Sequence, residues 1–166
     1  ISDQSNEGLI SDLLPEQLEF IRENWWYQKE EVPEYWFNSS IFILEMIKKD
    51  REDWLSLASK EIRSNKKIIK EIIEFQPKAI EYADVSLLND LEIAKLSTSK
   101  LPDTLRYFDE QVKSDFDIVL EAVSKDGSTL QYASDNLKNN FEIVSLAVNN
   151  YGYAINYASD EMKKNR

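Results

Sequence analysis

The chain has 166 residues, of which 42% are hydrophobic and 11% aromatic, as is typical of a globular protein rather than a disordered one. It contains no cysteine and no histidine, which excludes disulfides, zinc sites and Ser-His or Cys-His nucleophile pairs within the chain. The net charge of −11 disfavours nucleic acid as a partner and favours a basic protein. We therefore expect no cofactor, no metal site and no catalytic residues.

Membrane and export signals are missing from the sequence. No run of about 18 apolar residues predicts a membrane span, and the start, ISDQSNEGLISDLL, lacks the basic and apolar regions of a signal peptide. We expect a cytoplasmic protein, or a part of a protein that its host delivers. The missing initiator Met fits a trimmed or excised piece.

Residues 1–40 predict an acidic, aromatic-rich helical cap. They hold nine acidic residues against two basic ones. Residues 15–29 resemble a helix that begins at Pro15 and has apolar side chains along one side. Residues 32–40 align with 57–65, so the cap is also interpreted as a diverged repeat.

Six aromatic residues of this cap lie within thirteen positions: Trp25, Trp26, Tyr27, Tyr35, Trp36 and Phe37. One interpretation is purely structural, since the end units of a repeat array are usually atypical. The other is a binding surface, because aromatic side chains are enriched at interfaces and glutamates rim this cluster. The predicted partner-binding residues are Trp25, Trp26, Glu30, Glu31, Glu34, Tyr35 and Trp36.

The rest of the chain repeats with a period of 25 residues and no gaps. The blocks are 41–65, 66–90, 91–115, 116–140 and 141–165. Positions three, four, seven and eight of each block are mostly apolar and share one face of a helix. Four blocks are preceded by a good N-cap: Asn65, Asp90, Asp115 and Asn140. Each block therefore predicts a first helix of about ten residues.

The second half of each block predicts a turn and a shorter helix. Position twelve is occupied by Glu52, Pro77, Pro102, Gly127 and Gly152, and Pro and Gly both favour a turn there. An apolar cluster with a recurring tyrosine follows, and the Ser or Asp at position nineteen is expected to cap a final short turn. The tyrosines are Tyr82, Tyr107, Tyr132 and Tyr157. We expect them to pack in the core with each hydroxyl reaching a neighbouring turn.

One block cannot bury its own apolar face, whereas stacked blocks bury a continuous core. We therefore predict an all-α fold, an α-solenoid-like stack of about five 25-residue repeats, with 41–165 as one continuous domain and 1–40 as its cap. No polar capping unit follows the fifth repeat. This end of the stack is thus expected to associate with another copy, to meet a partner, or to belong to a longer array.

The strongest repeats resemble a known family. The stretch DFDIVLEAVSKDGSTLQYASDNLKNN at 115–140 and its copy at 140–165 are similar to the repeats called domain of unknown function 4116. The resemblance weakens over 41–115, where Pro77 and Pro102 replace the glycine. It implies a helical repeat fold found in bacteria and some protists, often in larger proteins. It implies no activity and no catalytic residues.

Two short motifs imitate a serine acyltransferase or β-lactamase. Ser97 to Lys100 forms S-x-x-K and Ser134 to Asn136 forms S-D-N, but K-T-G is missing and capping explains the second motif. A broken basic ladder consists of Arg63, Lys113, Lys138 and Lys163. It is interpreted either as a phosphate-tracking stripe or, in preference, as a solvated edge.

Taken together, these patterns predict a non-enzymatic protein–protein interaction module. The alternative is an acidic inhibitor or immunity-type protein that masks a basic partner such as a nuclease toxin, because the negative charge is concentrated beside the aromatic residues. A more distant alternative is a fragment of a larger enzyme or effector.

Overall fold

The computed structural model describes residues 12–23, 32–49 and 52–164 of the chain. In these ranges every regular element is a helix, which confirms the predicted all-α fold. The chain divides into two compact units, residues 1–83 and 84–166, and each is described below by itself. The prediction of a single continuous domain over 41–165 stays a prediction.

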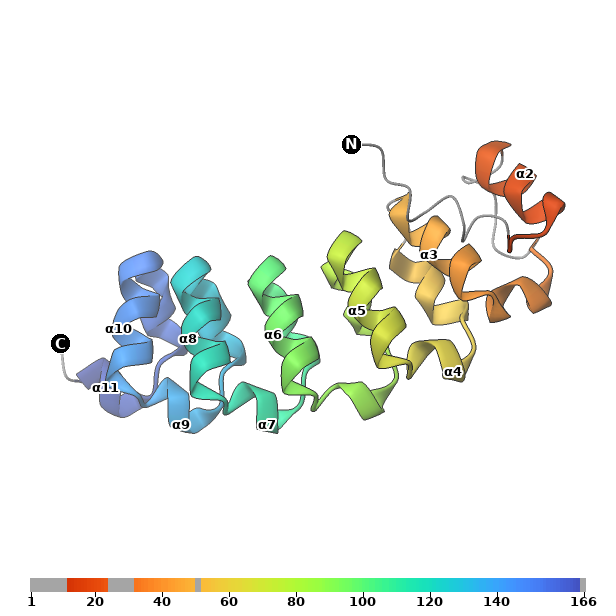
Figure 1. Ribbon diagram of the computed structural model, residues 1–166. Coiled ribbons are helices and arrows are strands. Elements are labelled where there is room, and N and C mark those ends of the chain that lie inside the picture. The colour runs from red at the N-terminus through yellow and green to blue at the C-terminus, as the bar shows by residue number, and fades with distance from the viewer. Residues whose placement is uncertain (1–11, 24–31, 50–51, 165–166) are drawn as a thin grey trace, which may run out of the picture. The chain divides into compact units, whose positions relative to one another are not determined.

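The N-terminal unit contains α-helices (α) and short 3-10 helices (η) (Figure 1). Their bounds are α2 Pro15–Glu23, η2 Glu34–Asn38, α3 Ser40–Lys48, η3 Glu52–Leu57, α4 Lys60–Arg63, α5 Lys66–Phe75 and η4 Pro77–Tyr82. Helix α3 begins one residue earlier than the 25-residue register predicts, with Ser39 as its N-cap.

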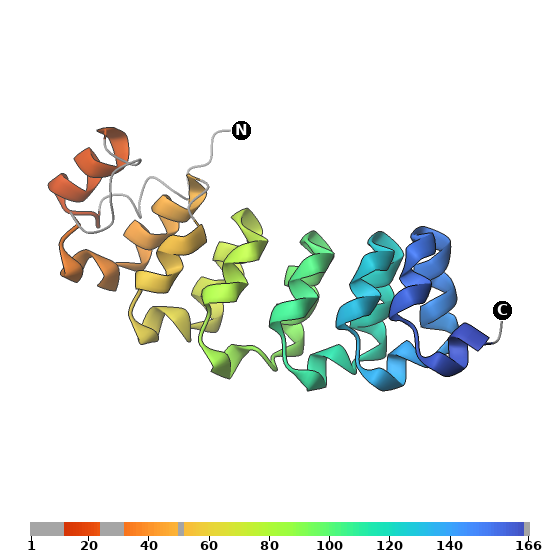
Figure 2. The ribbon, with the colours of Figure 1, turned by 180° about the vertical axis from the view of Figure 1, so that it is seen from behind.

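The C-terminal unit repeats a long α-helix, a 3-10 helix and a short α-helix (Figure 2). Its elements are η5 Val85–Leu87, α6 Leu91–Lys100, η6 Pro102–Tyr107, α7 Glu110–Lys113, α8 Phe116–Lys125, η7 Gly127–Tyr132, α9 Asp135–Lys138, α10 Phe141–Asn150, η8 Gly152–Tyr157 and α11 Asp160–Lys164.

The long helices begin where the repeat predicts because a polar side chain caps each of them. Asn65 accepts the amide N–H groups of Lys67 and Ile68 at 3.1 and 3.2 Å. The following long helices are capped in the same way, by the side-chain Oδ1 atoms of Asp90, Asp115 and Asn140. These bonds satisfy amide groups that have no partner within the helix itself.

The turn after each long helix lies one position earlier than predicted. Position eleven (Gln76, Leu101, Asp126 or Tyr151) has an extended backbone with φ between −139° and −144°. Position twelve is already the first residue of a 3-10 helix. Proline fits this place because its fixed φ and missing N–H match the start of a helix.

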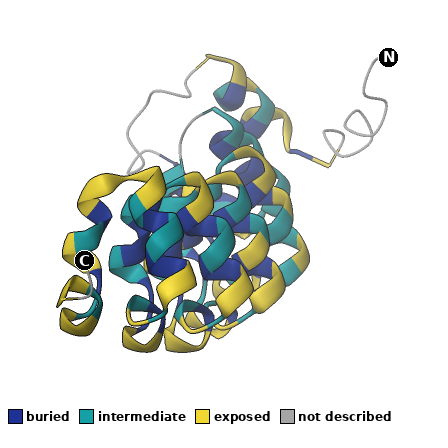
Figure 3. Ribbon diagram, turned by 90° about the vertical axis from the view of Figure 1, so that its left-hand side faces the viewer, coloured by how far each residue is buried: buried dark blue, intermediate teal, exposed yellow. Residues whose placement is uncertain are grey.

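The C-terminal unit has two layers, with α6, α8 and α10 side by side in one and η6, η7 and η8 in the other (Figures 1 and 2). The predicted apolar face points between the layers: Ile118, Val119, Ala122 and Val123 are at most 4% exposed. Figure 3 shows this division of the helices into buried and exposed sides. Burial of this face stabilises the stack at about 25 cal/mol per Å² of apolar surface.

The short helices join one repeat to the next. The amide of Ser134, the N-cap residue of α9, donates to the carbonyl of Lys113 at 2.9 Å. The amide of Ser159 likewise donates to the carbonyl of Lys138 at 2.9 Å. The N-terminal unit has a counterpart, in which the amide of Ser59 donates to Phe37 at 3.3 Å. This shared bond supports the interpretation of the cap as a diverged repeat.

An aromatic cluster forms the core of the N-terminal unit. Phe42 of α3 lies 5.2 Å from Trp36 of η2 and 5.8 Å from Trp54 of η3, measured between ring centroids. Phe20 of α2 lies 5.7 Å from Trp36 and 6.3 Å from Trp54. All four of these pairs meet edge to face, which is a favourable geometry for aromatic rings. Helix α2 is thus fastened to the first repeat by this cluster.

Candidate functional site

The predicted binding surface is only partly contained in the described residues. Trp25, Trp26, Glu30 and Glu31 lie outside them. Glu34, Tyr35 and Trp36 all belong to η2, which follows its N-cap Pro33. In a 3-10 helix neighbouring side chains point about 120° apart, so these three residues face different directions.

Trp36 points inward and is only 5% exposed. Its ring lies in the aromatic cluster between Phe20 and Phe42. The prediction that Trp36 contacts a partner is therefore corrected, because its side chain belongs to the core. For this residue the structural interpretation of the aromatic run holds.

Tyr35 points outward and is 57% exposed. Its hydroxyl donates to Oε1 of Glu16 in α2 at 3.3 Å, and its ring meets that of Trp36 edge to face at 6.4 Å. These two contacts orient the exposed ring, which lowers the side-chain entropy that it would lose on binding.

A hollow of about 730 Å³ lies beside Tyr35, which we call the Tyr35 hollow. It is lined by Glu34, Tyr35, Phe37, Asn38, Ser56, Leu57 and Ser59. Phe37 and Leu57 are half-buried and supply an apolar floor, whereas Glu34 is exposed at the rim. The hollow therefore combines apolar surface, one fixed aromatic ring and negative charge.

Several residues of this hollow carry no signal in the sequence that would identify them. Phe37 belongs to the aromatic run, but Leu57 and Ser56 lie in the next repeat, about 20 positions away. Glu16 and Tyr35 are 19 positions apart in the diverged cap, where no period links them. The alignment of 32–40 with 57–65 is the one pattern that places these two segments in equivalent roles.

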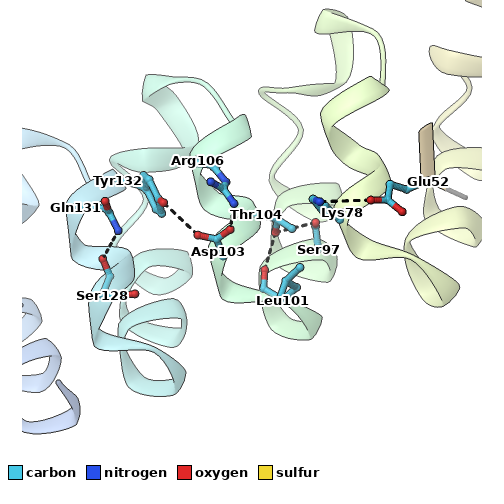
Figure 4. Close-up of polar contacts among 10 residues, drawn as sticks. All are labelled: Glu52, Lys78, Ser97, Leu101, Asp103, Thr104, Arg106, Ser128, Gln131 and Tyr132. Atoms are coloured by element: carbon cyan, nitrogen blue, oxygen red, sulfur yellow. Dashed lines mark hydrogen bonds and ion pairs between the residues drawn. The ribbon is translucent and has the colours of Figure 1, made fainter. Parts of the chain in front are cut away.

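The prediction that the recurring tyrosines pack in the core is wrong, because Tyr82, Tyr107 and Tyr132 are half-buried and Tyr157 is 36% exposed. The expected contact of the hydroxyl with a neighbouring repeat is found for Tyr132. The hydroxyl of Tyr132 donates to Oδ1 of Asp103, in η6 of the preceding repeat, at 3.1 Å (Figure 4). Arg106 pairs with the same Asp103 and lies over the ring of Tyr132, 5.8 Å from its centroid. The pKa of Tyr132 is raised, mainly because the hydroxyl is partly buried and secondly because it donates to Asp103.

The basic ladder does not form a cationic stripe. Lys113 and Lys138 line one hollow of about 400 Å³, but Glu110 and Asp135 line it too. Lys163 pairs with Asp160 at 3.7 Å, and Nε of Arg63 donates to the carbonyl of Ala58. This mixture of charges is what a solvated edge produces.

The serine of the S-x-x-K motif is buried. Ser97 is 0% exposed, and its hydroxyl donates to Oγ1 of Thr104 at 2.9 Å (Figure 4). Thr104 in turn donates to the carbonyl of Leu101 at 2.8 Å. Ser97 and Thr104 thus replace an apolar pair in the core by a satisfied hydrogen-bond chain.

A family model described as "Domain of unknown function (DUF4116)" matches the chain three times, over residues 40–87, 65–113 and 115–163. Together these matches cover most of the sequence. The chain belongs to this family. Each match spans two consecutive 25-residue repeats, so one family unit corresponds to a pair of long helices with their connections. No curated protein and no solved structure matches the chain.

Membership of this family supports a helical repeat module, and the description of the family names no function. None of the helices in the described ranges is both long enough and apolar enough to cross a bilayer. Over the same ranges, Asp and Glu residues form no group of three or more suited to a metal ion.

Proposed function

We propose that this chain is a non-enzymatic protein-binding module, and that the Tyr35 hollow binds a basic segment of another protein. The observation that carries the proposal is Tyr35 itself, a 57% exposed aromatic ring that is fixed by Glu16 at the edge of a hollow of about 730 Å³. Exposed aromatic residues that are already ordered are typical anchors of protein interfaces.

The chemistry of the hollow favours a lysine or arginine side chain. The face of an aromatic ring attracts a cation by about 0.5–2 kcal/mol. The carboxylates of Glu16 and Glu34 are available to pair with the charged end, since both are exposed. Phe37 and Leu57 offer an apolar surface to the methylene stem of the same side chain.

The acidic charge of residues 1–40 favours a narrower form of this function, in which the module masks a basic partner as an inhibitor or immunity-type protein does. Those residues hold nine acidic and two basic side chains. Such a field accelerates association with a basic protein, and salt screens it. Inhibition of the captured partner's own activity by this chain would distinguish masking from simple binding.

The test is a pull-down from a lysate of the source cells at low and high salt, with the 166-residue chain and two aromatic variants. Tyr35→Ala removes the anchor, whereas Phe75→Ala removes a 53% exposed aromatic residue of α5 that does not line the hollow, and it is the matched control. We expect a basic protein to be captured by the original chain and the control. Binding by Tyr35→Ala should be weaker by about 5- to 30-fold, which corresponds to about 1–2 kcal/mol.

Equal capture by both variants, with circular dichroism showing both folded, would place the binding surface elsewhere. Capture that is insensitive to salt would contradict the role of the carboxylates. If no protein is retained by the original chain at either salt concentration, the module does not bind a basic partner of those cells.

A further inference from the structure

The outer face of the last repeat is built like the faces that are covered by a following repeat. This face, which we call the C-terminal face, consists of α10 and η8. It exposes Tyr151 and Tyr153 at 42% and 72%. It also contains a hollow of about 650 Å³, lined by Asn150, Tyr151, Gly152, Tyr153, Ile155 and Asn156.

One repeat earlier, the corresponding face is covered by α10. Leu130, the counterpart of Ile155, is 0% exposed there, and Gly127 is buried. The end of α10 lies directly on Gly127, so that a Cβ atom at this glycine would be only 2.2 Å from the carbonyl oxygen of Ala147. Glycine at position 127 is therefore required by the close approach of the next helix.

Asn150 fastens the same contact. Its Oδ1 accepts the amide N–H of Gly127 at 2.8 Å, and its Nδ2 donates to the carbonyl of Ser124 at 3.0 Å. The first of these bonds satisfies the amide of η7's first residue, and the second satisfies a carbonyl in the last turn of α8. Asn150 thus joins the end of α10 to the preceding repeat through two hydrogen bonds.

Gly152 occupies the position of Gly127 but has no such neighbour. Nothing lies within 4 Å of a Cβ atom built on it, and its φ is outside the left-handed region that favours glycine. The turn does not demand glycine either, since Pro77 and Pro102 hold the same place in other repeats. Within the described structure, the space over Gly152 is empty, whereas the end of a long helix fills the corresponding space over Gly127.

We propose that the C-terminal face binds the first helix of a further repeat of this family. The carbonyl end of that helix would lie over Gly152, and an asparagine at its tenth position would bond the amide of Gly152 and the carbonyl of Asn149, the counterpart of Ser124. Tyr153, Ile155 and Asn156 would line the contact. This inference does not depend on the proposed function of the Tyr35 hollow.

A second copy of the chain does not present the required helix surface. In α10 that surface is already used against η7: Ala147 is 0% exposed, and both polar atoms of Asn150 are bonded to the preceding repeat. Two copies meeting through their C-terminal faces would bring together the opposite sides of their α10 helices. The glycine contact would not be reproduced.

The test extends the 166-residue chain by one repeat. A copy of residues 141–165 is placed in register after residue 165, and hydrogen exchange is measured by mass spectrometry for the segment 152–157. We expect exchange of this segment to slow by at least about tenfold in the extended chain, because the added helix buries it. Gly152→Leu in the extended chain should abolish the slowing, since the side chain would occupy the helix site.

The control is Gly152→Leu in the chain without the extension. There the site is open, so exchange of residues 116–151 should be unchanged, which shows that the variant folds. Slowing that survives Gly152→Leu, or an added repeat that leaves exchange of 152–157 unchanged, would overturn the proposal. A 166-residue chain that dimerises in analytical ultracentrifugation and becomes monomeric with Gly152→Leu would also overturn it, because the occupant would then be a second copy.

Discussion

Two glycines at the same position of successive repeats provide a direct test of how the repeats stack. A Cβ atom at position 127 would be 2.2 Å from the carbonyl oxygen of Ala147, whereas ordinary contact begins at 3.4 Å. Gly127→Ala therefore forces the end of α10 to move by about 1.2 Å, the difference between those two distances. At position 152 the same change meets no atom within 4 Å.

The magnitudes follow from two terms. Overpacking of a close contact costs about 1–3 kcal/mol. Displacing α10 also weakens the bond between Asn150 and the amide of Gly127, a contribution of about 1 kcal/mol. We expect Gly127→Ala to lower the free energy of unfolding by about 2–4 kcal/mol. Gly152→Ala should raise it by about 0.4–1 kcal/mol, because alanine restricts the unfolded chain.

The assay is urea unfolding of each variant followed by far-UV circular dichroism, with thermal unfolding as a second measurement. For a chain of this size the loss at Gly127 corresponds to a fall in Tm of about 5–15 °C. If Gly127→Ala unfolds like the original chain, α10 does not lie on Gly127 as described. If both variants are destabilised equally, the glycine is required by the turn and not by the neighbouring helix.

Three further predictions concern single side chains. Trp36→Ala should destabilise the N-terminal unit by about 3–5 kcal/mol in urea unfolding, because it leaves a cavity in the aromatic cluster; a near-neutral result would contradict its place in the core. The raised pKa of Tyr132 means that its neutral phenol stabilises the fold. This contribution is complete below the unfolded pKa of about 10, and it is lost as the pH rises through the higher folded pKa. Tyr132→Phe should therefore reduce the loss of stability in alkali, which chemical unfolding at several pH values measures. Ser134→Ala should be neutral or stabilising, because its buried hydroxyl has no hydrogen-bond partner among the described residues. Ser159→Ala loses the bond from the amide of Met162 and should cost about 1 kcal/mol, so equal effects in chemical unfolding would refute this distinction.

The interior of each repeat could be predicted because its determinants are local and recur every 25 residues. The caps at Asn65, Asp90, Asp115 and Asn140 each act on amides two or three residues ahead, so the residue type alone identifies the helix start. Position nineteen shows where this reasoning fails. Asp109 caps the next short helix through its carboxylate, but Ser134 does not cap through its hydroxyl.

The candidate site could be predicted less well, because most of it lies in residues 1–40, where the 25-residue period does not hold. The sequence identified Tyr35 and Glu34 as surface residues, but it treated Trp36 in the same way. Whether an aromatic side chain of η2 points inward depends on the phase of a five-residue helix, and such a short element contains too few residues to establish a phase. The partner of Tyr35 is Glu16 of α2, whose position is set by the aromatic cluster and not by any local pattern.

The contacts that join repeats are even harder to predict from the sequence, because in them a side chain of one repeat donates a hydrogen bond to a backbone carbonyl of the previous repeat. Nζ of Lys125 donates to the carbonyl of Ser99 at 2.7 Å, and Asn150 donates to that of Ser124. Lys125 and Asn150 occupy the same position of successive repeats and perform the same task with different chemistry. Since every residue carries a carbonyl, the accepting position is free to vary, and the donor is restricted only to a side chain long enough to reach it. In α8 and α10, stacking on the preceding repeat is therefore supported by the reach of the side chain at position ten, and for α10 also by the missing side chain of Gly127.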